Sequence, residues 1–152
     1  MQTKFTKLPD STPKWVQFFH AGTEWLQTFE MLEAEMKKET GVILFWVYPH
    51  VLYFSLELFV KSLASHVDPT FDARKGGFGH SAAGIIDTYK TTIPIFKEIS
   101  EDEDLFYLIK EYEKTLNTRF GETSVQIEGS DNQLVINSVY KLREEISKRT
   151  GL

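Results

Sequence analysis

The residues best suited to chemistry lie between Arg74 and His80, in the run Arg-Lys-Gly-Gly-Phe-Gly-His. Arg74 offers a bidentate fork for a phosphate group, and Lys75 offers a point charge. Gly77 and Gly79 allow backbone N–H groups to approach an anion, and the N-terminus of a following helix adds positive potential. The run therefore predicts a phosphate-binding loop. The simpler alternative is a surface loop whose glycines only make the turn before a helix.

Three further charged residues are candidates for the same site. Glu57 and Lys61 are four residues apart in a mostly apolar segment, which is the spacing of an intrahelical ion pair. The pair either lies on a solvated stripe, or Lys61 faces a cleft or a dimer seam, because a buried lysine without a role is costly. Arg119 closes a predicted helix, where it either bonds the last carbonyl groups or lines the same face as Lys61.

Metal-binding and nucleophile motifs are missing from the sequence. There is no cysteine, which excludes disulfides, zinc fingers and thiol nucleophiles. His20 and Glu24 are four residues apart, but two ligands do not make a site, and neither Glu-x-x-His, His-Glu-x-x-His nor a Walker loop occurs. We therefore expect no metal site and no cofactor.

The composition is that of a single soluble domain over residues 1–152. The formal net charge of −5 argues against a basic surface that wraps nucleic acid. The N-terminus lacks the apolar run of a signal peptide, and residues 1–12 are expected to be flexible. Segment 42–60 is nearly long enough to cross a bilayer but contains Glu57, so we interpret it as a buried bundle helix. These features predict a cytoplasmic protein without a membrane span.

Apolar residues recur with a period of 3.6 along most of the chain. This pattern predicts an all-α fold, an antiparallel up-and-down bundle of four or five helices. The first two helices are joined by a very short connection and must be antiparallel. We expect Pro94 to end or kink the third helix, Ser100 to begin the fourth, and 123–129 to be a short connector. The expected helices run approximately over 13–38, 42–66, 80–93, 100–120 and 130–150.

The order of these motifs resembles the HEPN domain (higher eukaryotes and prokaryotes nucleotide-binding). Residues 55–63 read Ser-Leu-Glu-Leu-Phe-Val-Lys-Ser-Leu, similar to the Glu-x-x-x-Lys–Leu core helix of that family. After a loop, Gly79 and His80 are similar to its Gly-His-Asp-Leu segment, although Ser81 stands where the family often has Asp. Arg119, followed by Phe, is similar to its Arg-Tyr.

The resemblance implies a non-catalytic HEPN-like domain that forms a homodimer through its apolar helices. It implies a cleft for a nucleotide or another phosphate-bearing ligand, in which Glu57 positions Lys61. Such domains often accompany a nucleotidyltransferase in toxin–antitoxin or defence systems. The residues expected to contact phosphate are Lys61, Arg74, Lys75 and His80, with backbone donors at Gly77 and Gly79.

Two alternatives remain open from the sequence. Many HEPN proteins are metal-independent endoribonucleases with an Arg-x(4–6)-His motif, and Arg74 and His80 have that spacing. Their position before the third helix differs from the family's catalytic motif near the final helix, so we favour a protein that is not an enzyme. The second alternative is a structural interaction module, whose partner interface would use the surplus of aromatic residues (12 Phe, 6 Tyr and 3 Trp).

Overall fold

The computed structural model describes residues 8–38, 47–75, 78–117 and 129–152. All regular structure in these ranges is helical, which confirms the all-α prediction. The prediction of a connector over 123–129 lies almost wholly outside the described residues, as does most of the segment 1–12. The six helices are α1 (Lys14–Met36), α2 (Val47–Val67), α3 (Ala82–Tyr89), α4 (Pro94–Glu101), α5 (Glu103–Asn117) and α6 (Gly129–Thr150).

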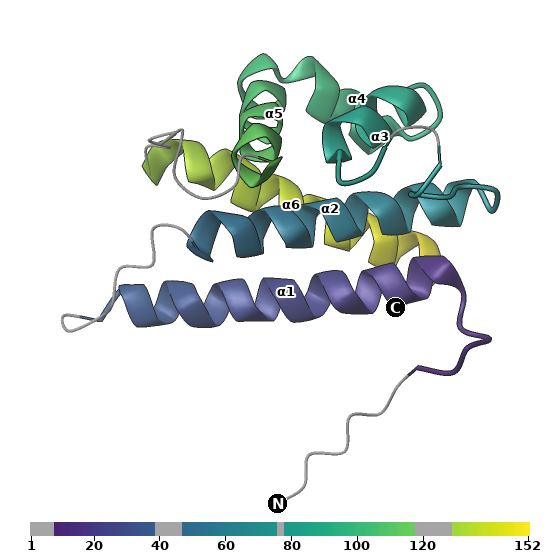
Figure 1. Ribbon diagram of the computed structural model, residues 1–152, viewed down its shortest axis with the longest axis horizontal. Helices are drawn as coiled ribbons and strands as arrows, with labels where there is room; N and C mark the ends of the chain where they lie inside the picture. Colours follow the sequence, from purple (N-terminus) through teal and green to yellow (C-terminus); the bar gives the residue numbers. More distant parts are fainter. Residues whose placement is uncertain (1–7, 39–46, 76–77, 118–128) are drawn as a thin grey trace, which may run out of the picture.

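Helices α1 and α2 form an antiparallel pair, as predicted, with the most extensive helix–helix contact of the described fold (Figure 1). Small and hydroxyl residues allow the two backbones to approach closely. Ser55 Oγ donates a hydrogen bond of 2.9 Å to the carbonyl oxygen of Gly22, and Ser62 Oγ donates one of 2.8 Å to that of Trp15. These bonds satisfy buried hydroxyl groups and fix the register of the pair.

Helix α2 lies at the centre of the molecule. It packs against α1 on one side, against α6 behind, and against α3 and α5 above (Figure 1). Most residues of α2 between Val51 and Ser65 are therefore buried, including Leu52, Leu56 and Leu63 at 0% exposure, whereas Phe54 and Leu58 are half-buried. Among the described residues, no helix combines the length and the apolar character that crossing a membrane requires.

Residues 82–101 form two helices, whereas the sequence predicted one helix that ends or is kinked at Pro94. Helix α3 ends at Tyr89, and α4 begins at Pro94, because proline fits the first turn of a helix but not its interior. The next helix begins later than the capping pattern at Ser100 predicted. Asp102 is the residue that caps it, accepting a 3.0 Å hydrogen bond from the amide of Leu105 through Oδ1.

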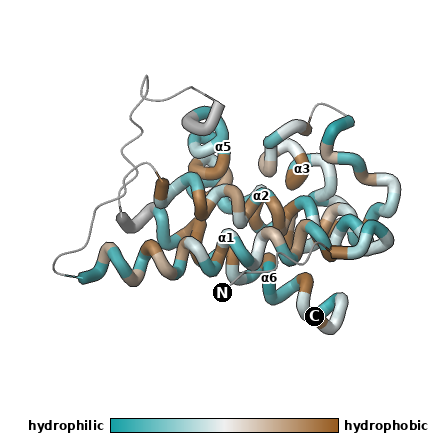
Figure 2. The backbone as a smooth tube through the Cα atoms, turned by 60° about the horizontal axis from the view of Figure 1, so that its bottom comes forward, coloured by the Kyte–Doolittle hydropathy of each residue, from teal (hydrophilic) through white to brown (hydrophobic). Residues whose placement is uncertain are grey.

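The distribution of hydropathy along the helices matches their positions. In Figure 2, hydrophobic residues recur along α2, whereas α1 alternates between hydrophilic and hydrophobic residues. Helix α1 therefore has one face on the core and one in solvent, and α2 carries the residues around which the other helices pack.

Candidate functional site

Glu57 and Lys61 form an ion pair in the interior of the protein. Both lie on α2, one turn apart, and their exposed fractions are only 2% and 7%. Lys61 Nζ donates a hydrogen bond to Glu57 Oε1. The pair is the intrahelical salt bridge that the spacing predicted, but it is buried and not on a solvated stripe. A buried pair is costly to desolvate, so its retention invites a functional explanation.

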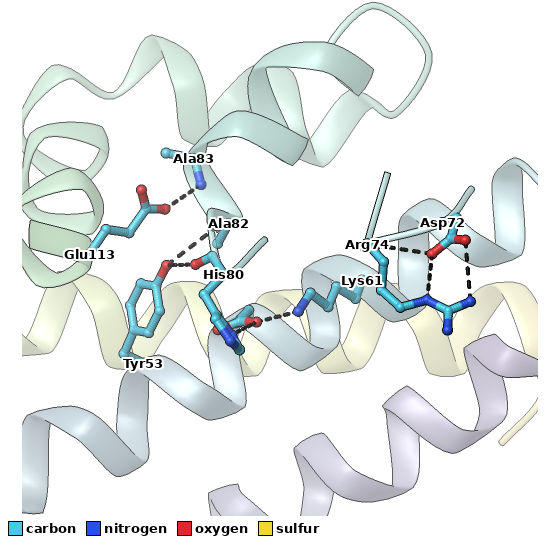
Figure 3. A network of polar contacts seen from close by, with 9 residues as sticks. Tyr53, Lys61, Asp72, Arg74, His80, Ala82, Ala83 and Glu113 are labelled. Carbon is cyan, nitrogen blue, oxygen red and sulfur yellow. Dashed lines mark hydrogen bonds and ion pairs between the residues drawn. The ribbon is translucent and has the colours of Figure 1, made fainter. Parts of the chain in front are cut away.

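His80 reaches the same carboxylate oxygen from the loop before α3. Its Nδ1 atom lies 3.1 Å from Glu57 Oε1, although the two residues are 23 positions apart (Figure 3). The side chain of His80 is 75% exposed, whereas that of Glu57 is 3% exposed. The imidazole ring therefore connects a buried carboxylate to the solvent. Lys61 and His80, predicted from separate motifs, meet at one oxygen atom.

The second carboxylate oxygen of Glu57 is also buried. Among the described residues, Oε2 has no hydrogen-bond partner. Buried polar atoms in folded proteins are nearly always hydrogen-bonded, and an exception calls for an explanation. Here Glu57 Oε1 lies within hydrogen-bond distance of both Lys61 Nζ and His80 Nδ1, whereas Oε2 has neither as a partner.

The backbone of His80 is held by a third residue of α2. The hydroxyl group of Tyr53 donates a 2.8 Å hydrogen bond to the carbonyl oxygen of His80 and accepts one of 3.4 Å from the amide of Ala82. Burial, reinforced by the negative charge of Glu113, raises the pKa of Tyr53 well above its ordinary value. Tyr53 therefore remains a protonated donor, and α2 holds both the ring and the backbone of His80.

Glu113 of α5 occupies the N-terminus of α3 (Figure 3). Its Oε1 accepts a 2.7 Å hydrogen bond from the amide of Ala83, and its Oε2 accepts one of 3.1 Å from Ser81 Oγ. Ser81 Oγ in turn accepts a 3.0 Å bond from the amide of Gly84. The sequence predicted that the positive N-terminal end of this helix helps to bind phosphate. In the structure this end of α3 already binds the carboxylate of Glu113.

The cations of the loop are at the surface. The side chain of Arg74 is 88% exposed, and its Nε lies 3.2 Å from Asp72 Oδ1. The amide of Arg74 donates a 3.0 Å bond to the same oxygen. Hydrogen bonds from Arg74 hold the pKa of Asp72 below its usual range, so this carboxyl group offsets one positive charge of the loop. Lys75 is exposed.

Of the glycines and the last arginine of the predicted site, the structure describes only Gly79. Gly79 has a φ of 51°, a left-handed conformation that favours glycine, and it is exposed next to His80. The predictions for Gly77 and Arg119 lie outside the described residues. The structure thus connects Glu57, Lys61 and His80 directly, and places Arg74, Lys75 and Gly79 on the loop that carries His80.

Sequence reasoning missed Tyr53 and Glu113. Tyr53 lies one helical turn before Glu57, but an apolar helix with an aromatic residue predicts core packing alone. Glu113 belongs to a helix rich in acidic residues, and nothing in the spacing singles it out. Its role depends on which helix terminus α5 packs against, and tertiary structure alone determines that.

The arrangement combines a carboxylate-supported imidazole with two exposed cations on the same loop. Among the described residues, no group of three or more His, Asp or Glu side chains is placed to hold a metal ion. Comparison with known protein families, curated proteins and solved structures finds no match to this chain. Its function must therefore be argued from the site itself.

Proposed function

We propose that this chain is a HEPN-like domain that binds a nucleotide or another phosphate-bearing ligand at the surface around His80. The observation that carries the proposal is the oxygen of Glu57 that joins the buried Lys61 to the exposed His80. It unites two motifs on which the family resemblance depends. The same loop supplies Arg74 and Lys75, so a ligand that contacts the imidazole ring has two cations close in sequence.

The direction from which a phosphate group approaches follows from the neighbouring charges. Glu113 already occupies the N-terminus of α3, so the ligand binds on the loop side of His80. Arg74 and Lys75 are exposed, and interactions between exposed charges are screened by salt. Lys61 is paired and buried, so it acts through Glu57 and not by direct contact with the ligand.

The binding experiment compares two pairs of adjacent cations. Titration calorimetry with a panel of nucleoside mono-, di- and triphosphates is expected to identify a ligand whose affinity falls with added salt. Arg74→Ala/Lys75→Ala should weaken it about a hundredfold or more, because each of the two lost charged hydrogen bonds costs about 1.5–3 kcal/mol. Lys37→Ala/Lys38→Ala removes two exposed cations at the far end of α1 and should leave the affinity unchanged. Absence of binding by the whole panel would contradict the proposal.

The proposed homodimer uses the exposed apolar face of the α1–α2 pair. Trp25 is 38% exposed and packs on the ring of Phe54 at a centroid distance of 5.3 Å, beside the half-buried Leu58. Aromatic residues in such partly exposed positions are typical of interfaces. By its resemblance, a second partner is a nucleotidyltransferase of a toxin–antitoxin or defence system.

Sedimentation velocity tests the homodimer. Trp25→Glu is expected to convert the dimer to monomer, whereas Tyr107→Glu, at an exposed aromatic residue on α5, is expected to leave the dimer intact. A wild-type protein that sediments as a monomer over the accessible concentration range would contradict this part of the proposal. It would leave the ligand-binding part standing.

A second candidate function is metal-independent RNA cleavage, which the contact between Glu57 and His80 favours. A carboxylate on Nδ1 is the arrangement that orients a histidine as a general base. His80 would take the proton of a ribose 2′-hydroxyl, the 2′-oxygen would attack the adjacent phosphorus, and the 5′-oxygen would leave and gain a proton. Arg74 would stabilise the negative charge on the non-bridging phosphate oxygens.

Incubation of short RNAs with the protein in EDTA tests this second function. The expected products are a 2′,3′-cyclic phosphate and a 5′-hydroxyl end, and His80→Ala is expected to abolish them without unfolding the protein. Intact RNA after prolonged incubation with the wild-type protein would eliminate cleavage and leave binding as the function.

A further inference from the structure

We propose that the cavity between α4, α5 and α6 is a separate ligand site, which binds a free aliphatic α-amino acid. Its lining residues belong to these three helices and to the residue that joins α4 to α5. None of them belongs to α2 or to the loop that carries His80. This site is therefore distinct from that of the phosphate-bearing ligand.

The size of the cavity limits what it can hold. Its volume is about 140 Å³, similar to an apolar cavity of about 150 Å³ that holds a benzene molecule. Pockets for drug-sized ligands and cofactors begin at about 300 Å³. The cavity is therefore too small for a nucleotide and suits a molecule the size of one amino acid.

The inner part of the cavity is apolar. Ile95 and Ile99 line it from α4 and Leu105 from α5, with exposed fractions of 9%, 4% and 6%. The half-buried Leu134 lines it from α6. An aliphatic group placed here removes apolar surface from water, which is favourable, whereas a charged group would lose its hydration without gaining a partner.

Two carboxylates line the cavity at the end of α4. Glu98 lies in the last turn of the helix, and Asp102 follows the helix, four residues later. Both residues are exposed, so they lie toward the mouth of the cavity. Among the described residues, neither forms an ion pair, and the side chain of Asp102 accepts only the bond from the amide of Leu105. Their remaining oxygen atoms can accept hydrogen bonds from an ammonium group.

Two donors line the cavity from α6. Asn137 and Lys141 are one turn apart and share a face of the helix. Within the part of the chain that the structure describes, Lys141 has no carboxylate partner. Asn137 Oδ1 accepts a 2.8 Å bond from Gln133 Nε2, so the amide nitrogen of Asn137 remains a donor. An ammonium group and an amide so arranged suit a carboxylate group of the ligand.

The charges at the mouth determine the class of ligand. Glu98 and Lys141 line the same cavity, but in the described structure they do not pair with each other. A ligand with one charge satisfies only one side of the mouth, whereas a zwitterion satisfies both. An α-amino acid holds its ammonium and carboxylate groups on one carbon atom, and an aliphatic side chain fits the apolar interior. Valine, leucine and isoleucine combine these properties.

Three probes that share one aliphatic group test the class of ligand. L-leucine carries both charges, isopentylamine lacks the carboxylate, and isocaproate lacks the ammonium group. Titration calorimetry is expected to give L-leucine a dissociation constant of about 1 mM or tighter. Each of the other probes should bind about tenfold more weakly or worse, the effect of one lost charged hydrogen bond. No binding of L-leucine, or equal binding of L-leucine and either probe, would overturn the proposal.

The exposed position of Lys141 allows a substitution that preserves the fold. Lys141→Met should weaken L-leucine about tenfold and abolish its preference over isopentylamine. Lys148→Met, at an exposed lysine of α6 outside the cavity, is the matched control and should leave both affinities unchanged. Arg74→Ala/Lys75→Ala should also leave L-leucine binding unchanged, which separates this site from the phosphate site. A full preference for L-leucine in Lys141→Met would overturn the recognition of a zwitterion.

Chemical-shift mapping locates the bound ligand. In ¹H–¹⁵N correlation spectra, L-leucine is expected to move the amide signals of Ile99, Leu105 and Ser138, which line the cavity. The signals of Gly79 and His80 should stay in place. Shifts confined to the loop that carries His80 would overturn the assignment of the ligand to the cavity.

Discussion

The carboxylate of Glu113 lies 2.7 Å from the amide nitrogen of Ala83, so a residue of α5 caps the N-terminus of α3. The amide groups at the start of a helix lack partners within the helix, and a carboxylate is well suited to them. Glu113 therefore joins two helices and fixes the first turn of α3, immediately after His80. The loop that carries the candidate site is thus held from α2 and from α5.

Glu113→Ala is expected to lower the free energy of unfolding by about 1–2 kcal/mol, the usual effect of losing a helix cap. Urea unfolding followed by circular dichroism measures this change. Glu113→Gln should cost less, because its amide oxygen can still accept from Ala83. Glu24→Ala, at an exposed carboxylate of α1, is the control and should have no effect. An equal, negligible change in all three variants would contradict the capping role.

Lys61→Met is expected to be strongly destabilising, by about 3–5 kcal/mol, because it leaves the carboxylate of Glu57 buried without its ammonium partner. Adding Glu57→Gln to this variant removes the charge and should recover most of the loss. Urea unfolding of the two single variants and the double variant measures the coupling. Lys148→Met, which breaks an exposed pair with Glu144 at the same spacing, is the control and should be nearly neutral. Additive effects of the two α2 substitutions would contradict a coupled buried pair.

Gly22→Ala is expected to destabilise the protein although alanine favours helices. A Cβ atom at position 22 would lie 3.0 Å from two ring carbons of Phe59 and 3.3 Å from Leu58 Cβ. Overpacking typically costs about 1–3 kcal/mol, against a gain of about 1 kcal/mol in helix propensity. Thermal unfolding should therefore show a lower midpoint.

A second substitution identifies the cause of this effect. Phe59→Leu makes room beside position 22, so Gly22→Ala should cost less in the Phe59→Leu background than in the wild-type protein. A higher midpoint for Gly22→Ala alone would mean that α1 and α2 can separate slightly at no cost.

Stability at alkaline pH is expected to depend on the hydrogen bond of 2.7 Å from the phenol of Tyr89 to Asp68 Oδ2. Burial and this bond raise the pKa of Tyr89 from 10.0 to about 12. Because the folded-state pKa is the higher one, the contribution is complete below pH 10 and is lost as the pH rises to about 12. Unfolding midpoints of the wild-type protein and Tyr89→Phe should therefore differ at pH 7 and converge near pH 12. A constant difference over this range would exclude the phenol as the titrating group.

The contribution of Asp68 to stability depends on pH in the opposite direction, because it is lost as the pH falls. Hydrogen bonds from Thr70 and then Tyr89 lower the pKa of Asp68 below 3.8 in the folded state. The contribution of Asp68 is therefore present above pH 3.8 and is lost as the pH falls through the folded-state pKa. Thr70→Val should reduce this acid dependence, and unfolding midpoints between pH 2 and 6 test it.

Local pattern was sufficient for much of the fold. The 3.6-residue period predicted α1 and α2, because an amphipathic face is visible in sequence, and the short connection expected between them predicted their antiparallel pairing. The four-residue spacing of Glu57 and Lys61 likewise predicted their ion pair. The start of α5 was misplaced, because Ser100 and Asp102 are both good caps and the choice between them depends on how α4 ends.

The candidate site was only partly predictable, because its main contacts join segments distant in sequence. His80 was selected for its type and its neighbours, but its contact with Glu57 requires the loop to fold back onto α2. The contact of Glu113 with the N-terminus of α3 could not be predicted for the same reason. The exposure of Arg74 and the burial of Lys61 are also tertiary properties, which charge patterning does not encode.

The central position of α2 has a consequence for how the chain folds. Its contact with α1 is local in sequence and can form early, whereas its contact with α6 requires closure of the long intervening segment. Until α6 arrives, one apolar side of α2 is exposed, and such intermediates are prone to aggregate. Substitutions at buried residues of α6, such as Val139, are therefore expected to impair the yield of refolding before they alter the site around His80.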